Sequence, residues 1–224
     1  MMLEADVLLR GQGTENETDI PIMAHPPDTD SDITLDQWLE KVSPTMKGIK
    51  LDFKSSNVLE PAMKVLQKYT YSQPVWLNAD IMTGPNAGQP VDSEEFKRAV
   101  GTYFPASTWS IGWTTSWRND PEIDQGYSEE MIDEMLEYVT DLPQPVTYPI
   151  RAAMVAKSWP QPLKKLLDAS RAATLTVWSG SNDDVDVDGL VRLRTESEEH
   201  RVYYDLPDAL MEEFLAKLNR TATV

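Results

Sequence analysis

Short apolar runs and amphipathic segments alternate along most of this chain. Seven apolar runs predict β-strands, over residues 3–9, 48–54, 74–81, 108–114, 146–151, 174–178 and 201–205. Apolar positions spaced three and four residues apart predict seven helices after them, over residues 35–42, 58–69, 93–104, 129–140, 162–170, 189–195 and 210–218. Strands that alternate with helices in this way are typical of repeated βα units and a parallel sheet.

The number of predicted units favours an α/β fold of the (β/α)8 TIM-barrel type that is one unit short. A closed barrel needs eight strands and usually ~200 to 250 residues, and this chain of 224 residues supplies seven predicted strands. Because the chain enters its first strand almost at once, we expect the first unit to be missing and the barrel to be truncated. No linker interrupts the pattern, so residues 1–224 are predicted to form a single domain. An open doubly wound sheet is the alternative, although no glycine-rich turn follows the first strand to support nucleotide binding.

The first predicted strand carries two acids in an otherwise apolar run. Glu4 and Asp6 are two residues apart, so their side chains project from the same face of a strand. Two neighbouring carboxylates repel and are costly to bury alone, and a metal ion is the common remedy. A second short apolar run, residues 22–24, then delivers His25, as expected for a hairpin. This arrangement indicates a small metal-assisted hydrolytic site, with a solvated edge strand and a turn histidine as the alternative.

Polar residues also stand toward the carboxyl ends of later predicted strands. A parallel strand buried on both faces should be almost entirely apolar, and barrel active sites lie at the carboxyl ends of the strands. Any one of these residues has an ordinary alternative as a cap or loop residue. Together they predict charge chemistry at one rim, where carboxylates hold a metal, cations receive a phosphate and a histidine moves a proton. The set is Glu4, Asp6, His25, Asp52, Lys54, Asn78, Asp80, Arg151 and Trp178.

Composition limits the partners of this chain. A formal net charge of −17 argues against nucleic acid and anionic membranes as partners, although a bound divalent cation would still allow a phosphate-bearing substrate. The chain has no cysteine, which excludes disulfides and cysteine-based zinc or redox chemistry. No apolar run is long enough to span a membrane, and the first residues lack the basic start of a signal peptide. We leave the compartment open, with the cytoplasm as the default and secretion as the alternative if upstream sequence is missing.

Several motifs together resemble the menorin family. They are MLEADVLLRG, PIMAHPPDTDSD, GIKLDFKS, VWLNADI followed by GPN, IGWTT, PIRAAMV and LTVWSG, and they extend from Met2 to about Asp205. That family is similar in turn to the glycerophosphodiester phosphodiesterases and the wider phospholipase-C-like barrels. The resemblance implies Glu4, Asp6 and Asp52 as ligands of Mg²⁺ or Ca²⁺.

The resemblance also implies a function and roles for further residues. His25 would protonate the leaving group, and Lys54 would act beside the metal. From their place at the strand ends, we expect Arg151, Asn78 and Trp178 to bind the substrate, a phosphodiester small molecule or a lipid head group. The family pattern places a second histidine on a strand upstream of the acid pair, and this chain has none there. We therefore expect a phosphodiester hydrolase of weak or absent activity. The alternative is a non-catalytic binding or signalling module that keeps the barrel and has a protein partner.

Overall fold

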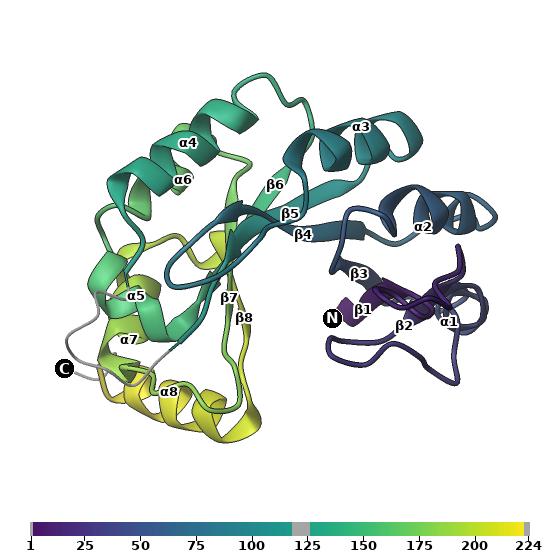
Figure 1. The fold of residues 1–224 in the computed structure, drawn as a ribbon. Helices are drawn as coiled ribbons and strands as arrows, with labels where there is room; N and C mark the ends of the chain where they lie inside the picture. Colours follow the sequence, from purple (N-terminus) through teal and green to yellow (C-terminus); the bar gives the residue numbers. More distant parts are fainter. Residues whose placement is uncertain (1, 118–125, 222–224) are drawn as a thin grey trace. The chain divides into compact units, whose positions relative to one another are not determined.

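The chain is described by a computed structural model over residues 2–117 and 126–221, and the predicted α/β class is confirmed (Figure 1). Strands and helices alternate along most of it. In chain order they are β1 (Met2–Leu9), β2 (Pro21–Met23), α1 (Leu35–Val42), β3 (Gly48–Phe53), α2 (Leu59–Leu66), β4 (Val75–Thr83), α3 (Ser93–Tyr103), β5 (Thr108–Thr114), α4 (Glu129–Val139), β6 (Val146–Arg151), α5 (Ala152–Ser158), α6 (Lys164–Ala169), β7 (Thr174–Trp178), α7 (Val187–Glu196), the 3₁₀-helix η1 (Glu199–Arg201), β8 (Val202–Asp205) and α8 (Asp208–Thr221).

The strands join one eight-stranded sheet in the order β2-β1-β3-β4-β5-β6-β7-β8. The parallel pairing predicted from the alternation is confirmed for β1 with β3, β3 with β4, β6 with β7, and β7 with β8. The short strand β2 runs antiparallel to β1 and completes the expected hairpin. The order has two ends, β2 and β8, so within the described residues the strands form an open series and not the closed ring of a barrel.

The structure contains one strand and one helix that the sequence pattern did not predict. Strand β2 is only 3 residues long, so its apolar run was too short to be counted among the seven predicted strands. Helix α5 begins at Ala152, directly after β6 ends at Arg151. No turn residue separates the two, which explains why the pattern concealed this helix.

The fold divides into two compact units, and each is described by itself. The first unit comprises Met1–Ile81 and Pro90–Ile111, and the second comprises Met82–Gln89 and Gly112–Val224. A single domain over the whole chain therefore stays a prediction. In the first unit, Phe96 of α3 packs edge-on against Trp109 of β5, with ring centroids 5.4 Å apart.

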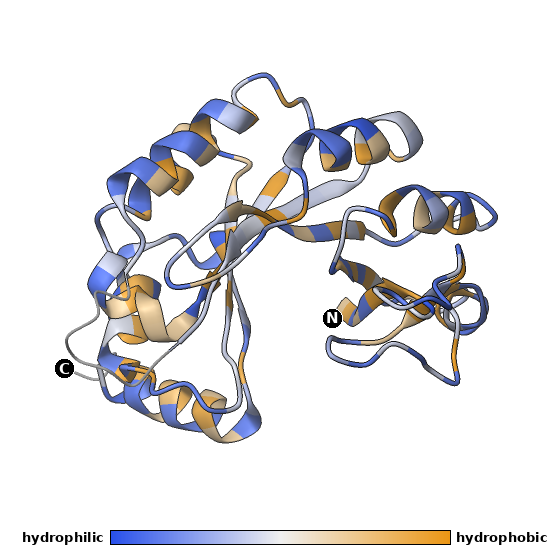
Figure 2. Cartoon of the chain, in the orientation of Figure 1, coloured by the Kyte–Doolittle hydropathy of each residue, from blue (hydrophilic) through white to orange (hydrophobic). Residues whose placement is uncertain are grey.

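The helices carry apolar residues on one side, as the periodicity predicted (Figure 2). In α4, for example, Ile132 and Met135 are buried while the acids of the first turn are not. Burial of such side chains is the main favourable term in folding. No helix in the described residues is long and apolar enough to cross a membrane.

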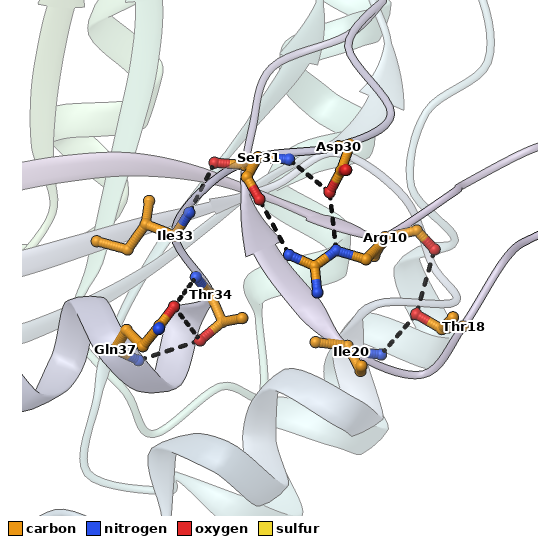
Figure 3. Close-up of polar contacts among 8 residues, drawn as sticks. All are labelled: Arg10, Thr18, Ile20, Asp30, Ser31, Ile33, Thr34 and Gln37. Atoms are coloured by element: carbon orange, nitrogen blue, oxygen red, sulfur yellow. Dashed lines mark hydrogen bonds and ion pairs between the residues drawn. The ribbon is translucent and has the colours of Figure 1, made fainter.

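Polar contacts fix the segment between β1 and α1 (Figure 3). Nε of Arg10 donates to Oδ1 of Asp30 over 2.8 Å, and its Nη2 donates to the carbonyl of Ser31 over 3.0 Å. Thr34 and Gln37 then form a capping box that starts α1, since each side chain satisfies a backbone N–H of the other. The acidic loop that follows His25 is thereby tied back to the end of β1.

Candidate functional site

Strand register brings the acids of β1 and β3 together. Asp6 lies opposite Asp52, and Asp52 lies opposite Asn78 on β4. Asp6 is inside β1 and not at its end, because β1 continues to Leu9. The parallel pairing with β3 stops at Val7, however, and only β2 pairs with the rest of β1. Asp6 and Asp52 therefore stand at the carboxyl edge of the parallel pair, as predicted.

Lys54 joins the two carboxylates. Its Nζ lies 2.9 Å from Oδ1 of Asp6 and 2.5 Å from Oδ2 of Asp52. Burial alone would lower the pKa of Lys54, but the charges of Asp52 and Asp6 and their hydrogen bonds raise it above the ordinary lysine value. Lys54 is therefore a permanent positive charge between two acids.

A buried hydrogen-bond chain holds Asp52 from the other side. Nδ2 of Asn78 donates to Oδ1 of Asp52 over 2.7 Å, and Oγ of Ser110 donates to Oδ1 of Asn78 over 2.5 Å. Asn78 is 3% exposed and Ser110 is 0% exposed. With its amide engaged on both sides, Asn78 orients Asp52 in this structure. Its predicted contact with substrate stays a prediction.

Glu4 does not join the cluster of Asp6, Asp52 and Lys54. It lies opposite Lys50, and the Nζ of Lys50 is 2.7 Å from Oε1 of Glu4. The Lys50 side chain is only 9% exposed, whereas the Glu4 side chain is 36% exposed, so the ion pair is shielded from water on the lysine side alone. Glu4 and Asp6 share a face of β1, but each has a lysine from the β3 segment as its own partner.

Asp80 is a further acid near this cluster. It follows Asn78 by two residues on β4 and therefore points to the same face. Burial and then the charge of Asp52 raise the pKa of Asp80 to about 7, against a smaller lowering by Lys54 and Lys50. Asp80 was predicted as part of the polar rim without a role of its own, and Ser110 was not predicted at all. The two-residue spacing from Asn78 and the small polar residue among the apolar residues of β5 were the available signals.

The cluster fits a divalent cation in part. Carboxylate oxygens are the ligands that Mg²⁺ and Ca²⁺ prefer, and the ammonium of Lys54 marks a point that Asp6 and Asp52 already share. The third expected ligand, Glu4, is held by Lys50. Within residues 2–117 and 126–221, no three His, Cys, Asp or Glu side chains are grouped so that they could hold a metal ion. Asp6 and Asp52 are therefore two candidate ligands, and the Lys54 ammonium occupies the point between them.

His25 stands two residues after the end of β2 and is exposed. Its Nδ1 lies 2.6 Å from the carbonyl oxygen of Pro26. A carbonyl can only accept, so Nδ1 carries the proton and the neutral ring keeps its lone pair on Nε2. The ring is thus set up to take a proton at Nε2. Its predicted role stays a prediction.

The second unit holds the other two predicted residues together. Arg151 at the end of β6 lies opposite Trp178 at the end of β7, with its guanidinium carbon 5.0 Å from the centroid of the indole ring. Arg151 also donates to both carboxylate oxygens of Asp183, over 2.8 and 2.6 Å, and to the carbonyl of Thr115 over 3.0 Å. Its donors are therefore committed within the chain, and binding of a phosphate there would require the Asp183 pair to open.

The matches to known proteins cover both the acid cluster around Lys54 and the pair of Arg151 and Trp178. Residues 1–211 match the Menorin N-terminal domain. Protein FAM151B of Homo sapiens is 45% identical over 216 residues, which cover 95% of this chain and 77% of FAM151B. No solved structure matches the chain significantly.

Proposed function

This chain belongs to the menorin family, and from that premise we propose that it is a metal-dependent phosphoric diester hydrolase of the glycerophosphodiester phosphodiesterase type. One observation carries the proposal: Asp6 and Asp52, from neighbouring parallel strands, share a single cationic group at the carboxyl edge of the sheet. The architecture of a phospholipase-C-like barrel is part of the same proposal. The substrate is a phosphodiester small molecule or a lipid head group.

Asp6 and Asp52 hold the cation in this proposal, and Glu4 is the third candidate ligand, in competition with its ion pair to Lys50. When bound, Mg²⁺ or Ca²⁺ would polarise a phosphoryl oxygen and lower the pKa of the attacking water molecule. Asn78 and Ser110 keep Asp52 in one orientation through their hydrogen bonds. Lys54, once released from the two carboxylates, donates its N–H groups to a phosphate oxygen.

His25 moves the proton. With Nδ1 donating to the carbonyl of Pro26, the ring protonated at Nε2 gives this proton to the leaving-group oxygen as the P–O bond breaks, and Nε2 regains a proton from the attacking water. Because the structure also gives His25 a solvent-facing position, the same nitrogen can exchange its proton with water. This is the role expected from the family resemblance.

A second candidate is a non-catalytic binding module, and the neutralisation of the acids favours it. Lys54 and Lys50 already pair with Asp6, Asp52 and Glu4. A cluster satisfied from within the chain can serve as a structural layer without any metal. In this alternative the module contributes a binding surface, and no bond is broken.

Turnover separates the two candidates. We would incubate the chain with a panel of glycerophosphodiesters and Mg²⁺ or Ca²⁺ and measure the release of phosphomonoester. The hydrolase predicts cation-dependent release that Asp52→Asn and His25→Ala abolish. The variant Glu40→Gln, at an exposed position of α1, is the matched control and should turn over normally. Cation binding without turnover would favour the binding module, and the absence of both would contradict the hydrolase.

A further inference from the structure

We propose that a recess beside the amino ends of β6 and β7 binds a small, neutral molecule that has both apolar and hydrogen-bonding groups. The recess has a volume of about 440 Å³, which falls within the range of ligand pockets. It lies wholly in the second unit, between the last turn of α4, the start of β6 and the segment that joins α6 to β7. None of the residues discussed above as a candidate site contributes to it.

The walls of the recess carry no charge. Twelve residues line it: Leu136, Val139, Thr140, Leu142, Gln144, Pro145, Val146, Tyr148, Ala169, Ser170, Ala172 and Ala173. Asp, Glu, Lys and Arg make up 25% of this chain, so twelve lining residues without one of them are unusual. A charged ligand would lose its hydration there without gaining a counter-ion. The lining therefore selects a neutral ligand.

Tyr148 supplies a polar group in the wall. The residue is 2% exposed, and its ring packs at a tilt near Trp113, with centroids 6.4 Å apart. Burial raises the pKa of Tyr148 to about 12, so the hydroxyl stays neutral and can both donate and accept.

Two hydroxyl groups of the wall, those of Thr140 and Ser170, already make hydrogen bonds within the chain. Oγ1 of Thr140 donates to the carbonyl of Leu136 over 2.8 Å, and Oγ of Ser170 accepts from the N–H of Ala172 over 3.2 Å. Tyr148 thus contributes a neutral hydroxyl, and Gln144 a neutral amide, to the polar part of the wall. A molecule with an apolar ring and one hydroxyl or amide matches this lining.

An arginine outside the lining fixes one side of the recess. Arg201 of η1 donates to three backbone carbonyls, those of Leu167, Ser170 and Ala173, over 2.6, 2.5 and 2.8 Å. These contacts fix the segment between α6 and β7, which forms one side of the recess. A wall held in this way needs little ordering when a ligand enters, and that favours binding.

Fluorine NMR with 4-fluorobenzyl alcohol as the probe tests this proposal. We expect saturable binding at millimolar concentration, typical of a molecule of this size. Ala172→Trp should fill the recess and abolish binding, while Ala216→Trp, at an exposed position of α8 in the same unit, should leave it unchanged. Tyr148→Phe keeps the ring and removes only the hydroxyl, so it should weaken binding by roughly three- to tenfold.

Charged analogues test the chemical class. 4-Fluorobenzoate and 4-fluorobenzylammonium should bind at least roughly tenfold more weakly than the alcohol, because the walls offer neither of them a counter-ion. The proposal is overturned if the alcohol shows no saturable binding, or if it binds Ala172→Trp as well as the parent. Equal binding of the charged analogues would overturn the assignment of a neutral ligand. Amide NMR spectra of both variants would verify that they are folded.

Discussion

The ammonium nitrogen of Lys54 lies 2.5 Å from Oδ2 of Asp52, two positions earlier in the chain. The same nitrogen is 2.9 Å from Asp6 on the neighbouring strand. One internal cation thus neutralises two acids, and a divalent cation must compete with it for the same oxygens. This competition links the stability of the first unit to its affinity for metal ions.

Removal of Lys54 should therefore destabilise the chain in a way that metal ions reverse. Lys54→Ala leaves two partly buried carboxylates without a counter-ion, and we expect a loss of about 1–3 kcal/mol in the free energy of unfolding. Urea unfolding in EDTA would measure it, and added Ca²⁺ should restore most of the loss. Lys64→Gln removes an exposed ion pair with Glu60 and should leave the free energy of unfolding almost unchanged, because exposed pairs contribute little. A Lys54→Ala variant as stable as its parent would contradict this account.

Ser110→Ala should loosen the orientation of Asp52, although Ser110 contacts Asn78 and not Asp52 itself. The substitution leaves the buried Oδ1 of Asn78 without its donor, which costs about 1–2 kcal/mol in the free energy of unfolding. If Ser110 acts through Asn78, a double-mutant cycle with Asn78→Ala should show strong non-additivity. Urea unfolding of the three variants would supply the cycle. Additive effects would mean that the chain of hydrogen bonds does not operate as one unit.

Asp80 should give the chain a distinct pH dependence of stability. Its folded pKa is raised to about 7, above the ordinary value of ~3.9 in an unfolded chain. The folded state therefore binds the proton more tightly, and this contribution to stability is fully present below pH ~4 and is lost as the pH rises through about 7. Asp80→Asn removes the dependence.

The comparison of Asp80→Asn with its parent measures this contribution. At pH 8 the variant should be more stable by as much as ~4 kcal/mol, and at pH 4 the two should differ little. Urea unfolding at pH 4, 6 and 8 would test both values, with the exposed Glu94→Gln of α3 as the control. A difference that does not change with pH would contradict the raised pKa.

Arg201 should control the order of the segment between α6 and β7. Arg201→Lys keeps the charge but cannot donate to three carbonyls from one planar group. We expect a loss of about 1–3 kcal/mol in the free energy of unfolding. Amide exchange should accelerate around Ser170 and Ala173, which hydrogen-bond to each other, and not in β3. Unchanged exchange in that segment would show that Arg201 does not fix it.

The sequence predicted most elements of this fold because their periodicity is local. The amphipathic spacing of α1 and its capping residue Thr34 are both legible in a few neighbouring residues. By contrast, α5 follows Arg151 without a turn, and β2 depends on its pairing with β1. Closure of the sheet depends on contacts between distant strands, and local patterns do not report these.

The candidate site was predictable to a similar degree. The two-residue spacing of Glu4 and Asp6 places them on one face, and Asp6, Asp52 and Lys54 do come together. Which lysine pairs with which acid follows from the register of β1 against β3, and that register is a tertiary property. For the same reason, the link from Ser110 to Asn78, 32 residues apart, left no trace in the sequence pattern.

Calorimetric titration with Ca²⁺ and Mg²⁺ tests the central claim most directly. The account predicts one saturable cation site per chain, with affinity that falls at least roughly tenfold in Asp52→Asn and rises in Lys54→Ala, because the internal competitor is gone. Glu40→Gln should titrate as the parent does. No saturable binding in either the parent or Lys54→Ala, or equal affinity in Asp52→Asn, would contradict a cation site between Asp6 and Asp52.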